Sequence, residues 1–269
     1  MDEVVALDYP ALLAARLLRP PLGWLDVTTS LRHFAIISYL VPLERLRPHV
    51  NPQFGIVPFT VDGRKYGLLS VVPFLDQDFC FSRLPWLRFR FGQTNYRLYV
   101  TDQQGEDQAW FFGTTLGAAA VAFAHHAWQL PWYRARYQFA TTYSASQQRY
   151  TRYQVRTQSA WAAAEIALVG TGHAMGLLPG FHSLDQQRYV LTNPVRGVFY
   201  RRDGRLGSYT IWHPAMELTT GRLLHARFAL LERLGILSRQ ETQQPHSVLL
   251  SPRVEFQISL PPALYKEKN

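Results

Sequence analysis

The sequence predicts an α+β fold built mainly from antiparallel β-sheet, and three observations lead to this class. Most apolar stretches after Leu31 alternate apolar and polar residues with the period of two that strands show. Aromatic residues make up 14% of the chain, and their rings suit pleated, half-buried surfaces. No repeat, low-complexity linker or break in composition divides the 269 residues. We therefore expect one domain over residues 28–269, preceded by a helical arm over residues 1–27.

The first half of the chain is predicted to hold one helix in the arm and mostly strands after it. The arm helix covers Ala11–Leu18 and ends where two prolines follow Arg19. A short helix over Pro42–Arg47 starts with a proline, which the first helical position tolerates. β-Branched and aromatic residues, with a turn signal at residues 102–105, predict four strands: Arg32–Tyr39, Tyr66–Phe74, Leu87–Thr101 and Ala109–Gly113.

The second half of the chain is predicted to mix helices and strands. An alanine-rich run that opens with threonine predicts a helix over Thr115–Trp128. An amphipathic pattern that ends at Gly235 predicts another over Gly221–Leu234. A shorter helix is expected near Asp185–Val190, after a glycine-rich loop over Gly170–Gly180. The other segments are predicted strands, with a hairpin turned by Asp203-Gly204: Arg134–Thr142, Arg149–Thr157, Ala160–Val169, Gly197–Arg201, Arg205–Trp212 and Val248–Ile258.

Composition excludes a disordered chain, and the distribution of the basic residues argues against a specific nucleic-acid partner. With 47% hydrophobic and 17% charged residues, the chain is not intrinsically disordered. Its 28 basic residues exceed the 19 acidic ones, and the resulting net charge of +9 suggests a polyanion partner. Three of the 28 are lysines, which leaves 25 arginines, and these are scattered without a nucleic-acid-binding motif. Arg152 and Arg156, for example, alternate with apolar residues as on a solvated strand face, so we expect no specific nucleic-acid partner.

Cysteine, histidine and the apolar runs indicate the compartment and exclude a metal site. Cys80 is the sole cysteine, so neither an internal disulfide nor a cysteine zinc cluster can form. The acidic start Met1-Asp2-Glu3 is unlike a secretion signal, and the apolar stretch Leu116–Ala124 is about half of a membrane span. None of the nine histidines has the spacing of a recognised metal site. We expect a cytoplasmic protein without membrane span, metal or cofactor, and leave open whether it forms a homo-oligomer.

The long strand Leu87–Thr101 has the most informative polar pattern. Side chains alternate between the two faces of a strand, which places Gln93, Asn95 and Arg97 together after an apolar first half. In an open sheet this face would meet water, whereas in a closed barrel it would point into the lumen. In a lumen, the amide of Asn95 and the guanidinium of Arg97 would suit a carboxylate or a carbonyl.

Two further residues complete the candidate ligand-binding set. Thr114 lies in the glycine-flanked run 113–117, whose backbone amides suit an anion and whose threonine equally suits a helix cap. His213 ends a strand before a proline, and His213 or a tyrosine would be the acid or base if the site were catalytic. The chain has no G-x-S-x-G motif and its thiol lies between two phenylalanines, so no catalytic residue is assigned.

A series of short motifs spans the chain from about Leu31 to Leu260. In order, they are Asn95-Tyr96-Arg97-Leu98-Tyr99-Val100, Trp110-Phe111-Phe112, Leu130-Pro131-Trp132-Tyr133-Arg134-Ala135-Arg136, Leu191-Thr192, His213-Pro214 and Ser251-Pro252-Arg253-Val254-Glu255. This series resembles the YqjF-like family of uncharacterised proteins, which is similar to the acetoacetate decarboxylase-like superfamily. The resemblance implies a mainly antiparallel β-barrel with helices packed outside and a ligand cavity within.

The same resemblance shows what this chain lacks. Enzymes of that superfamily use a lysine as a Schiff-base nucleophile, shortly after the strand that here reads Trp110-Phe111-Phe112. This chain has Gly113-Thr114-Thr115 there, and Gln93 stands near where family members tend to carry a glutamate. We therefore expect no imine-forming decarboxylation.

Three classes of function remain open. The preferred one is the binding of a small apolar or carbonyl/carboxylate ligand in the cavity, because the sequence offers binding groups but no activated nucleophile. The second is an enzyme of unassigned reaction that uses the same cavity. The third is a structural or interaction protein whose cavity is filled core. The candidate ligand-binding residues are Gln93, Asn95, Arg97, Thr114 and His213.

Overall fold

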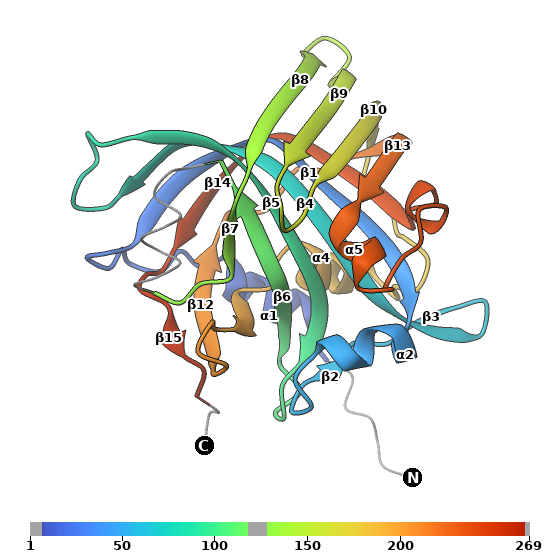
Figure 1. Cartoon of the computed structure of the whole chain (residues 1–269), viewed down its shortest axis with the longest axis horizontal. Helices are drawn as coiled ribbons and strands as arrows, with labels where there is room; N and C mark the ends of the chain where they lie inside the picture. Colours follow the sequence, from blue (N-terminus) through green and yellow to red (C-terminus); the bar gives the residue numbers. More distant parts are fainter. Residues whose placement is uncertain (1–6, 118–127, 267–269) are drawn as a thin grey trace.

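A long, mainly antiparallel sheet curls on itself into a ring in the computed structural model, which describes residues 7–117 and 128–266 (Figure 1). The ring follows the order β14–β1–β4–β5–β6–β11–β12, and it closes because β12 pairs with β14 as well as with β11. Its strands are β1 (Val27–Pro42), β4 (Arg64–Phe81), β5 (Phe89–Thr101), β6 (Asp107–Leu116), β11 (Arg196–Tyr200), β12 (Leu206–Trp212) and β14 (Ser247–Ile258).

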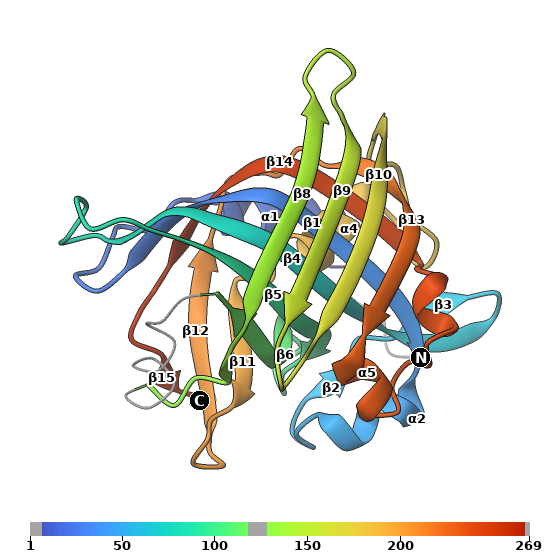
Figure 2. The same cartoon turned by 45° about the horizontal axis from the view of Figure 1, so that its top comes forward.

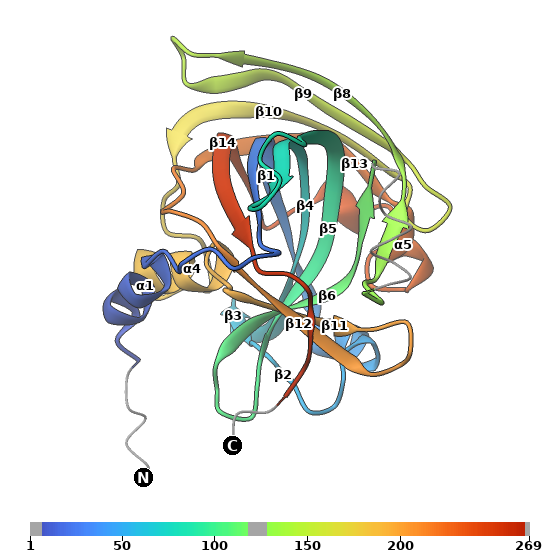
Figure 3. The ribbon, with the colours of Figure 1, turned by 90° about the vertical axis from the view of Figure 1, so that its left-hand side faces the viewer.

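A second group of strands, which we call the flap, continues the sheet from β14 and lies over one side of the ring. The flap contains β13 (Thr219–Phe228), β10 (Ala164–Ala174), β9 (Arg149–Gln158) and β8 (Arg136–Ser144). Figures 2 and 3 show it arching over β1, β4 and β5. Side chains such as Ile37 and Tyr96 from the ring pack there against Tyr153 and Ile166 from the flap. The outer face of these ring strands is therefore a closed apolar core.

The inner face of the ring packs against two helices. α1 (Tyr9–Leu17) lies on α4 (Leu184–Leu191), and the Tyr9 and Tyr189 rings meet edge to face at 5.6 Å. A second core joins Tyr189 and Leu191 of this pair to Phe34 and Val72 of the ring. Short elements connect the rest: α2 (Leu43–Leu46), η1 (Arg47–His49), β2 (Gly55–Ile56), β3 (Phe59–Val61), β7 (Trp132–Arg134), α5 (Ala229–Arg233), η2 (Glu241–Gln243) and β15 (Ala263–Leu264).

Most sequence-based predictions of elements are confirmed, with strands that are longer than expected. The predicted α+β, mainly antiparallel class is correct, and the hairpin of β11 and β12 and the closing strand β14 lie where expected. In β9, Tyr153 and Val155 are buried whereas Arg152 and Arg156 are exposed, as on a solvated face. None of the described helices is long and apolar enough to cross a lipid bilayer.

The predicted helix over Gly221–Leu234 is wrong for most of its length. That segment forms β13, and only its end forms the short α5. Ala226 and Phe228 are buried because β13 pairs with β10, while Leu224 is 55% exposed. The apolar spacing fits a helix as well as a strand, and the partner strand decides between them.

Two other boundaries differ from the predictions. Thr115 was expected to open a helix, but it pairs with Thr94 as part of β6, so the strand continues through Leu116. The remainder of that predicted helix falls largely on residues 118–127, which lie outside the described residues. The predicted glycine-rich loop begins inside β10, which extends to Ala174 along β13. In both cases pairing to a neighbouring strand extends the sheet past the residues with clear strand propensity.

Candidate functional site

The inner face of the ring carries three of the five predicted residues on a single strand. Gln93, Asn95 and Arg97 lie on β5 opposite Phe74, Val72 and Ser70 of β4, and paired residues share a face. The alternate residues Tyr96 and Leu98 point into the core beneath the flap. The prediction that the polar residues share one face is confirmed.

Two hydrogen-bond donors hold the side-chain oxygen of Asn95 and leave its side-chain NH₂ group available. Its Oδ1 accepts hydrogen bonds from Gln93 Nε2 and from Thr114 Oγ1, each at 2.9 Å. Thr114 stands directly opposite Asn95 on β6, so the sheet itself brings these two predicted residues together. Among the described residues no acceptor binds Asn95 Nδ2. Because Gln93 and Asn95 are only partly buried, this donor faces space that solvent reaches.

Arg97 is a buried cation without an acidic partner. The side chain is 6% exposed, and its Nη2 donates to the carbonyl of Leu191 at 2.8 Å and to the hydroxyl of Tyr99 at 3.3 Å. Its Nε is buried with no partner, and no carboxylate in the described part of the chain forms a salt bridge with it. A buried guanidinium normally pairs with an anion, so this one has unused capacity to bind one.

His213, the fifth predicted residue, lies near Arg97 but is engaged by the main chain. Its two ring nitrogens lie 2.6 Å from the carbonyl of Thr192 and 2.8 Å from that of Pro214. Burial lowers the pKa of His213 below its usual value, although these two carbonyls raise it. The ring also stacks on Phe256 of β14, with centroids 4.7 Å apart. This arrangement fixes the chain after α4 and leaves the ring nitrogens little freedom to meet a ligand.

Sequence reasoning missed the aromatic wall beside Arg97. Tyr209 on β12 is close enough that Arg97 lowers the pKa of its phenol, although burial raises that pKa more. Its ring centroid lies 5.7 Å from that of Phe111, which stands opposite Arg97 on β6. The alternation of β12 could have indicated a shared face, but not that this face turns toward β5.

Sequence reasoning also missed Asp76, the most perturbed carboxyl group inside the ring. Asp76 lies on β4 opposite Phe91, is 1% exposed, and accepts one hydrogen bond from Thr29 Oγ1 at 3.0 Å. Its Oδ2 has no partner, and burial raises the pKa of the carboxyl to about 7. It lies six positions after Ser70, which faces Arg97, so the two groups are about 20 Å apart along the strand. Asp76 and Arg97 therefore cannot act on the same small ligand.

No lysine of the described chain lies in this constellation. The segment Gly113–Leu116 belongs to β6 and carries no lysine, while Lys65 and Lys266 are exposed. The described residues also contain no group of three or more His, Cys, Asp and Glu side chains placed to hold a metal ion. Among the described residues of the predicted set, the donors on the inner face that lack an acceptor are thus those of Asn95 and Arg97.

A separate pocket of about 630 Å³ lies outside this constellation. It is bounded by α1, β12, β14 and the turn between β5 and β6, and none of the five predicted residues lines it.

Several solved structures of enzymes have a similar fold. Acetoacetate decarboxylase from Legionella pneumophila aligns with a TM-score of 0.59 at 12% identity, covering 94% of each chain. The enduracididine biosynthesis enzyme MppR in complex with pyruvate aligns with a TM-score of 0.54 at 12% identity, covering 92% of this chain and 91% of that chain. An acetoacetate decarboxylase-like enzyme from Sphingomonas wittichii RW1 gives 0.54 at 8% identity, covering 88% and 92%. At these identities the similarity concerns the fold alone.

Sequence comparison gives a family without an assigned activity. The model of DUF2071, described as an uncharacterized conserved protein, matches residues 28–255. No curated protein matches the chain significantly. The family match and the solved structures together confirm the resemblance seen in the sequence motifs.

Proposed function

The chain belongs to the DUF2071 family of uncharacterized conserved proteins, and we propose that it binds a small oxo acid, a compound with a carboxylate and a carbonyl group, on the inner face of its ring. The proposed site consists of Arg97 and Asn95 as donors, Gln93 and Thr114 as their supports, and Phe111 and Tyr209 as walls. The ligand is held without formation of an imine.

The unpaired charge of Arg97 carries this proposal. Arg97 as a whole is 6% exposed, so its guanidinium has lost most of its hydration, and a single carbonyl and a phenol hydroxyl do not replace an anion. Its Nε is unpaired but enclosed, so a carboxylate that displaces the groups around it would form a charge-assisted hydrogen bond with the guanidinium. A carboxylate ligand would therefore neutralise the most costly group of the inner face.

The position of Asn95 accounts for the second group of the ligand. Asn95 precedes Arg97 by two residues on the same face, about 7 Å along the strand. Because Gln93 and Thr114 occupy its carbonyl oxygen, Asn95 can offer only N–H donors to the ligand. A carbonyl oxygen next to the carboxylate would accept from it. The MppR structure contains pyruvate on a similar fold, which makes that compound a suitable first probe.

The experiment compares pyruvate with acetone and acetate by isothermal titration calorimetry. We expect pyruvate to bind more tightly than either fragment, and Arg97→Met to weaken it about tenfold or more. Arg152→Met is the matched control, because Arg152 is exposed on β9 and bonds only to Gln154. If Arg97→Met binds pyruvate as the wild type does, the site is wrong. If none of the three compounds binds, the inner face is better described as filled core.

Borohydride trapping separates binding from imine chemistry. The chain has lysines only at positions 65, 266 and 268, and none lies on β6. We expect treatment with pyruvate and borohydride to give no increase in protein mass. A lysine adduct would contradict the non-covalent mode of binding.

The unpaired carboxyl of Asp76 favours a second function, proton transfer to or from a carbonyl compound. With its pKa raised to about 7, Asp76 is suited to general acid–base catalysis near neutral pH. This reaction would need a separate subsite near Phe91, because Arg97 is too distant. Exchange of the methyl protons of pyruvate in D₂O, followed by NMR, tests it. Exchange that is catalysed by the wild type and lost in Asp76→Asn would establish this function in place of simple binding.

A further inference from the structure

Two loops at one end of the ring carry an exposed aromatic and basic surface. The first, residues 22–25, precedes β1, and the second, residues 83–90, spans the turn between β4 and β5 and the first two residues of β5. Figures 1 and 2 show these loops, blue and teal, projecting side by side from the ring. Every residue of both segments is exposed. We call the two segments together the tryptophan patch.

The apolar side chains of the tryptophan patch are exposed to an unusual degree. Trp24 is 71% exposed and Trp86 is 77% exposed, although tryptophan is on average a well-buried residue. The other large apolar residues of the patch are between 37% and 47% exposed: Leu22, Leu25, Leu84, Leu87 and Phe89. Apolar side chains gathered on the surface in this way mark sites of interaction with another protein or with a membrane.

The two loops are fixed against each other, so the patch is already formed in the free protein. Ser82 Oγ lies 2.8 Å from the carbonyl oxygen of Gly23 and 2.9 Å from that of Trp24, and the main-chain N–H of Ser82 donates to the carbonyl of Asp26 at 2.8 Å. The guanidinium of Arg83 lies 4.9 Å from the ring centroid of Trp24. A surface that is organised before binding loses little conformational entropy when it binds.

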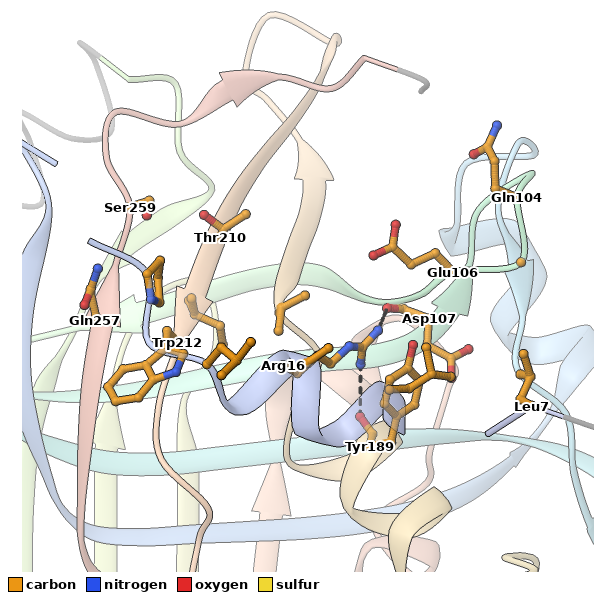
Figure 4. Close-up of a pocket in the computed structure, with 17 residues that line it drawn as sticks. Leu7, Arg16, Gln104, Glu106, Asp107, Tyr189, Thr210, Trp212, Gln257 and Ser259 are labelled. Atoms are coloured by element: carbon orange, nitrogen blue, oxygen red, sulfur yellow. Dashed lines mark hydrogen bonds between the residues drawn. The ribbon is translucent and has the colours of Figure 1, made fainter. Parts of the chain in front are cut away.

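The first loop is also held to the ring at its two ends. Before it, Trp212 Nε1 donates to the carbonyl of Leu17 at 3.1 Å, and the guanidinium of Arg19 lies 4.9 Å from the Trp212 ring centroid. Figure 4 shows Trp212 in this position beside α1. After it, the carboxylate of Asp26 accepts hydrogen bonds from the N–H groups of Gly23 and Leu260. The exposure of Trp24 is thus set by the fold and not by a free end of the chain.

The charge of the tryptophan patch indicates the kind of partner. Arg83, Arg88 and Arg90 are exposed within it, and neither segment contains an acidic residue. Arg88 forms an ion pair with Asp78 at 3.4 Å, but both side chains are exposed, so this pair is weak. In a symmetric dimer formed through the patch, the arginines of the two copies would meet and repel each other. An anionic bilayer instead offers phosphates for the arginines and an interfacial layer that tryptophan favours.

From these observations we propose that the tryptophan patch docks the protein on the surface of an anionic lipid bilayer. The indole rings of Trp24 and Trp86 lie at the level of the lipid headgroups, and Arg83 and Arg88 donate to lipid phosphates. The leucines of the patch insert beside the indole rings. This docking is independent of the oxo acid site proposed inside the ring.

The first test is co-sedimentation of the wild-type protein with vesicles. We expect at least about tenfold tighter binding to an equal mixture of phosphatidylcholine and phosphatidylglycerol than to phosphatidylcholine alone, and weaker binding as the salt concentration rises. Lipids brominated on their acyl chains should quench part of the tryptophan fluorescence in the mixed vesicles. No binding to the mixed vesicles, or equal binding to both kinds, overturns the proposal.

Substitution of the two tryptophans tests the aromatic part of the patch. Trp24→Ser combined with Trp86→Ser should weaken binding to the mixed vesicles about tenfold or more and remove the quenching by brominated lipids. Leu177→Ser combined with Leu224→Ser is the control, because these leucines are 52% and 55% exposed and lie outside the patch. Unchanged vesicle binding by the tryptophan variant would overturn the proposal.

Substitution of two arginines tests the basic part of the patch. Arg83→Gln combined with Arg88→Gln should weaken binding about tenfold. Arg152→Gln combined with Arg156→Gln removes the same charge from the exposed face of β9, where Arg156 is also in an exposed ion pair, and should change binding less. Equal losses in the two variants would show that only the net charge matters and that the patch is not the docking surface.

Sedimentation velocity without vesicles distinguishes a protein interface from a lipid-binding surface. We expect the wild type and the double tryptophan variant to have the same oligomeric state. A dimer of the wild type that the tryptophan variant loses would show that the patch binds a second copy of the chain, and would overturn docking on lipid.

Discussion

Arg16 and Arg97 reach the same stretch of main chain, one from α1 and the other from β5, but they differ in how they are neutralised. Arg16 donates to the carbonyls of Tyr189 and Asn193, while Arg97 donates to that of Leu191 between them. These carbonyls lie at and just after the C-terminal end of α4, where a helix has unpaired acceptors and a partial negative charge. Both arginines therefore stabilise the same helix end.

The two arginines differ in how many of their hydrogen-bond donors lack a partner and in whether acidic side chains lie nearby. Both terminal nitrogens of Arg16 are used, and its guanidinium lies 3.5 Å from the Tyr189 ring centroid. Burial lowers the pKa of Arg16, and the nearby Asp107 and Glu106 oppose that shift. In the described part of the chain, no acid pairs with Arg97, and its Nε has no hydrogen-bond partner. Two arginines with one structural task thus have different potential for binding: Arg16 is complete without a ligand, whereas Arg97 is not.

The largest effect on stability should come from two buried carboxyl groups, Asp76 inside the ring and Asp107 beside Arg16. Burial raises the pKa of Asp76 to about 7 from 3.8, so the folded protein holds a proton that the unfolded chain releases between these pH values. Stability should therefore fall as the pH rises from about 4 to about 7, by up to about 4 kcal/mol. Asp76→Asn should remove this loss and be more stable than the wild type at pH 8, as urea denaturation at pH 4, 6 and 8 would show.

Asp107 provides the comparison for that experiment. Its pKa is raised only to about 6, since Arg16 opposes the effect of burial. Asp107→Asn should therefore change the pH dependence less than Asp76→Asn does. Equal effects of the two substitutions would contradict the conclusion that the ring interior is the drier and less compensated environment.

Loss of Arg16 should give the next largest effect. Arg16→Met removes three hydrogen bonds from a charged donor and leaves three partly buried carbonyls unpaired, which we expect to cost about 3 kcal/mol. Urea denaturation at pH 7 measures the free energy of unfolding. Pyruvate affinity should not change in the folded protein. A loss of pyruvate binding without a loss of stability would reverse the roles assigned to the two arginines.

Arg97→Met should destabilise the protein less than Arg16→Met. The lost hydrogen bond to Leu191 is partly offset because a buried, unpaired charge disappears, so a cost of about 1 to 2 kcal/mol is expected. The same denaturation series supplies the value. A cost above that of Arg16→Met would mean that Arg97 is chiefly a structural residue.

Gln93→Glu should have the smallest effect. The new carboxylate would lie four residues from Arg97 on the same face, about 13 Å along the strand. At that separation its repulsion of a bound carboxylate amounts to roughly 0.5 kcal/mol, or about a twofold loss of pyruvate affinity. Calorimetry of this variant beside Gln93→Ala separates the charge effect from the lost hydrogen bond to Asn95. A tenfold loss specific to Gln93→Glu would place the ligand closer to Gln93 than to Arg97.

The sequence predicted the fold class well because strand periodicity and turn residues are local signals. The alternation along β5 and β9, and the Asp203-Gly204 turn of the β11–β12 hairpin, need no knowledge of distant residues. β13 was missed because its apolar spacing fits two periods, and only pairing with β10 selects the strand. Thr115 was placed in a helix because the alanine-rich run after it has high helix propensity, whereas its strand partner Thr94 lies far back in the chain.

The same contrast between local signals and long-range contacts applies to the candidate site. By itself, the sequence determined that Gln93, Asn95 and Arg97 share a face, that the segment Gly113–Leu116 carries no lysine, and that the basic surplus consists of scattered arginines. The tertiary structure alone decided that the ring closes through β12 and β14, that Tyr209 lies near Arg97, and that no acid among the described residues pairs with Arg97. The physical reason is range: side-chain alternation is fixed by the backbone of one strand, whereas burial and charge pairing depend on residues that only folding brings together.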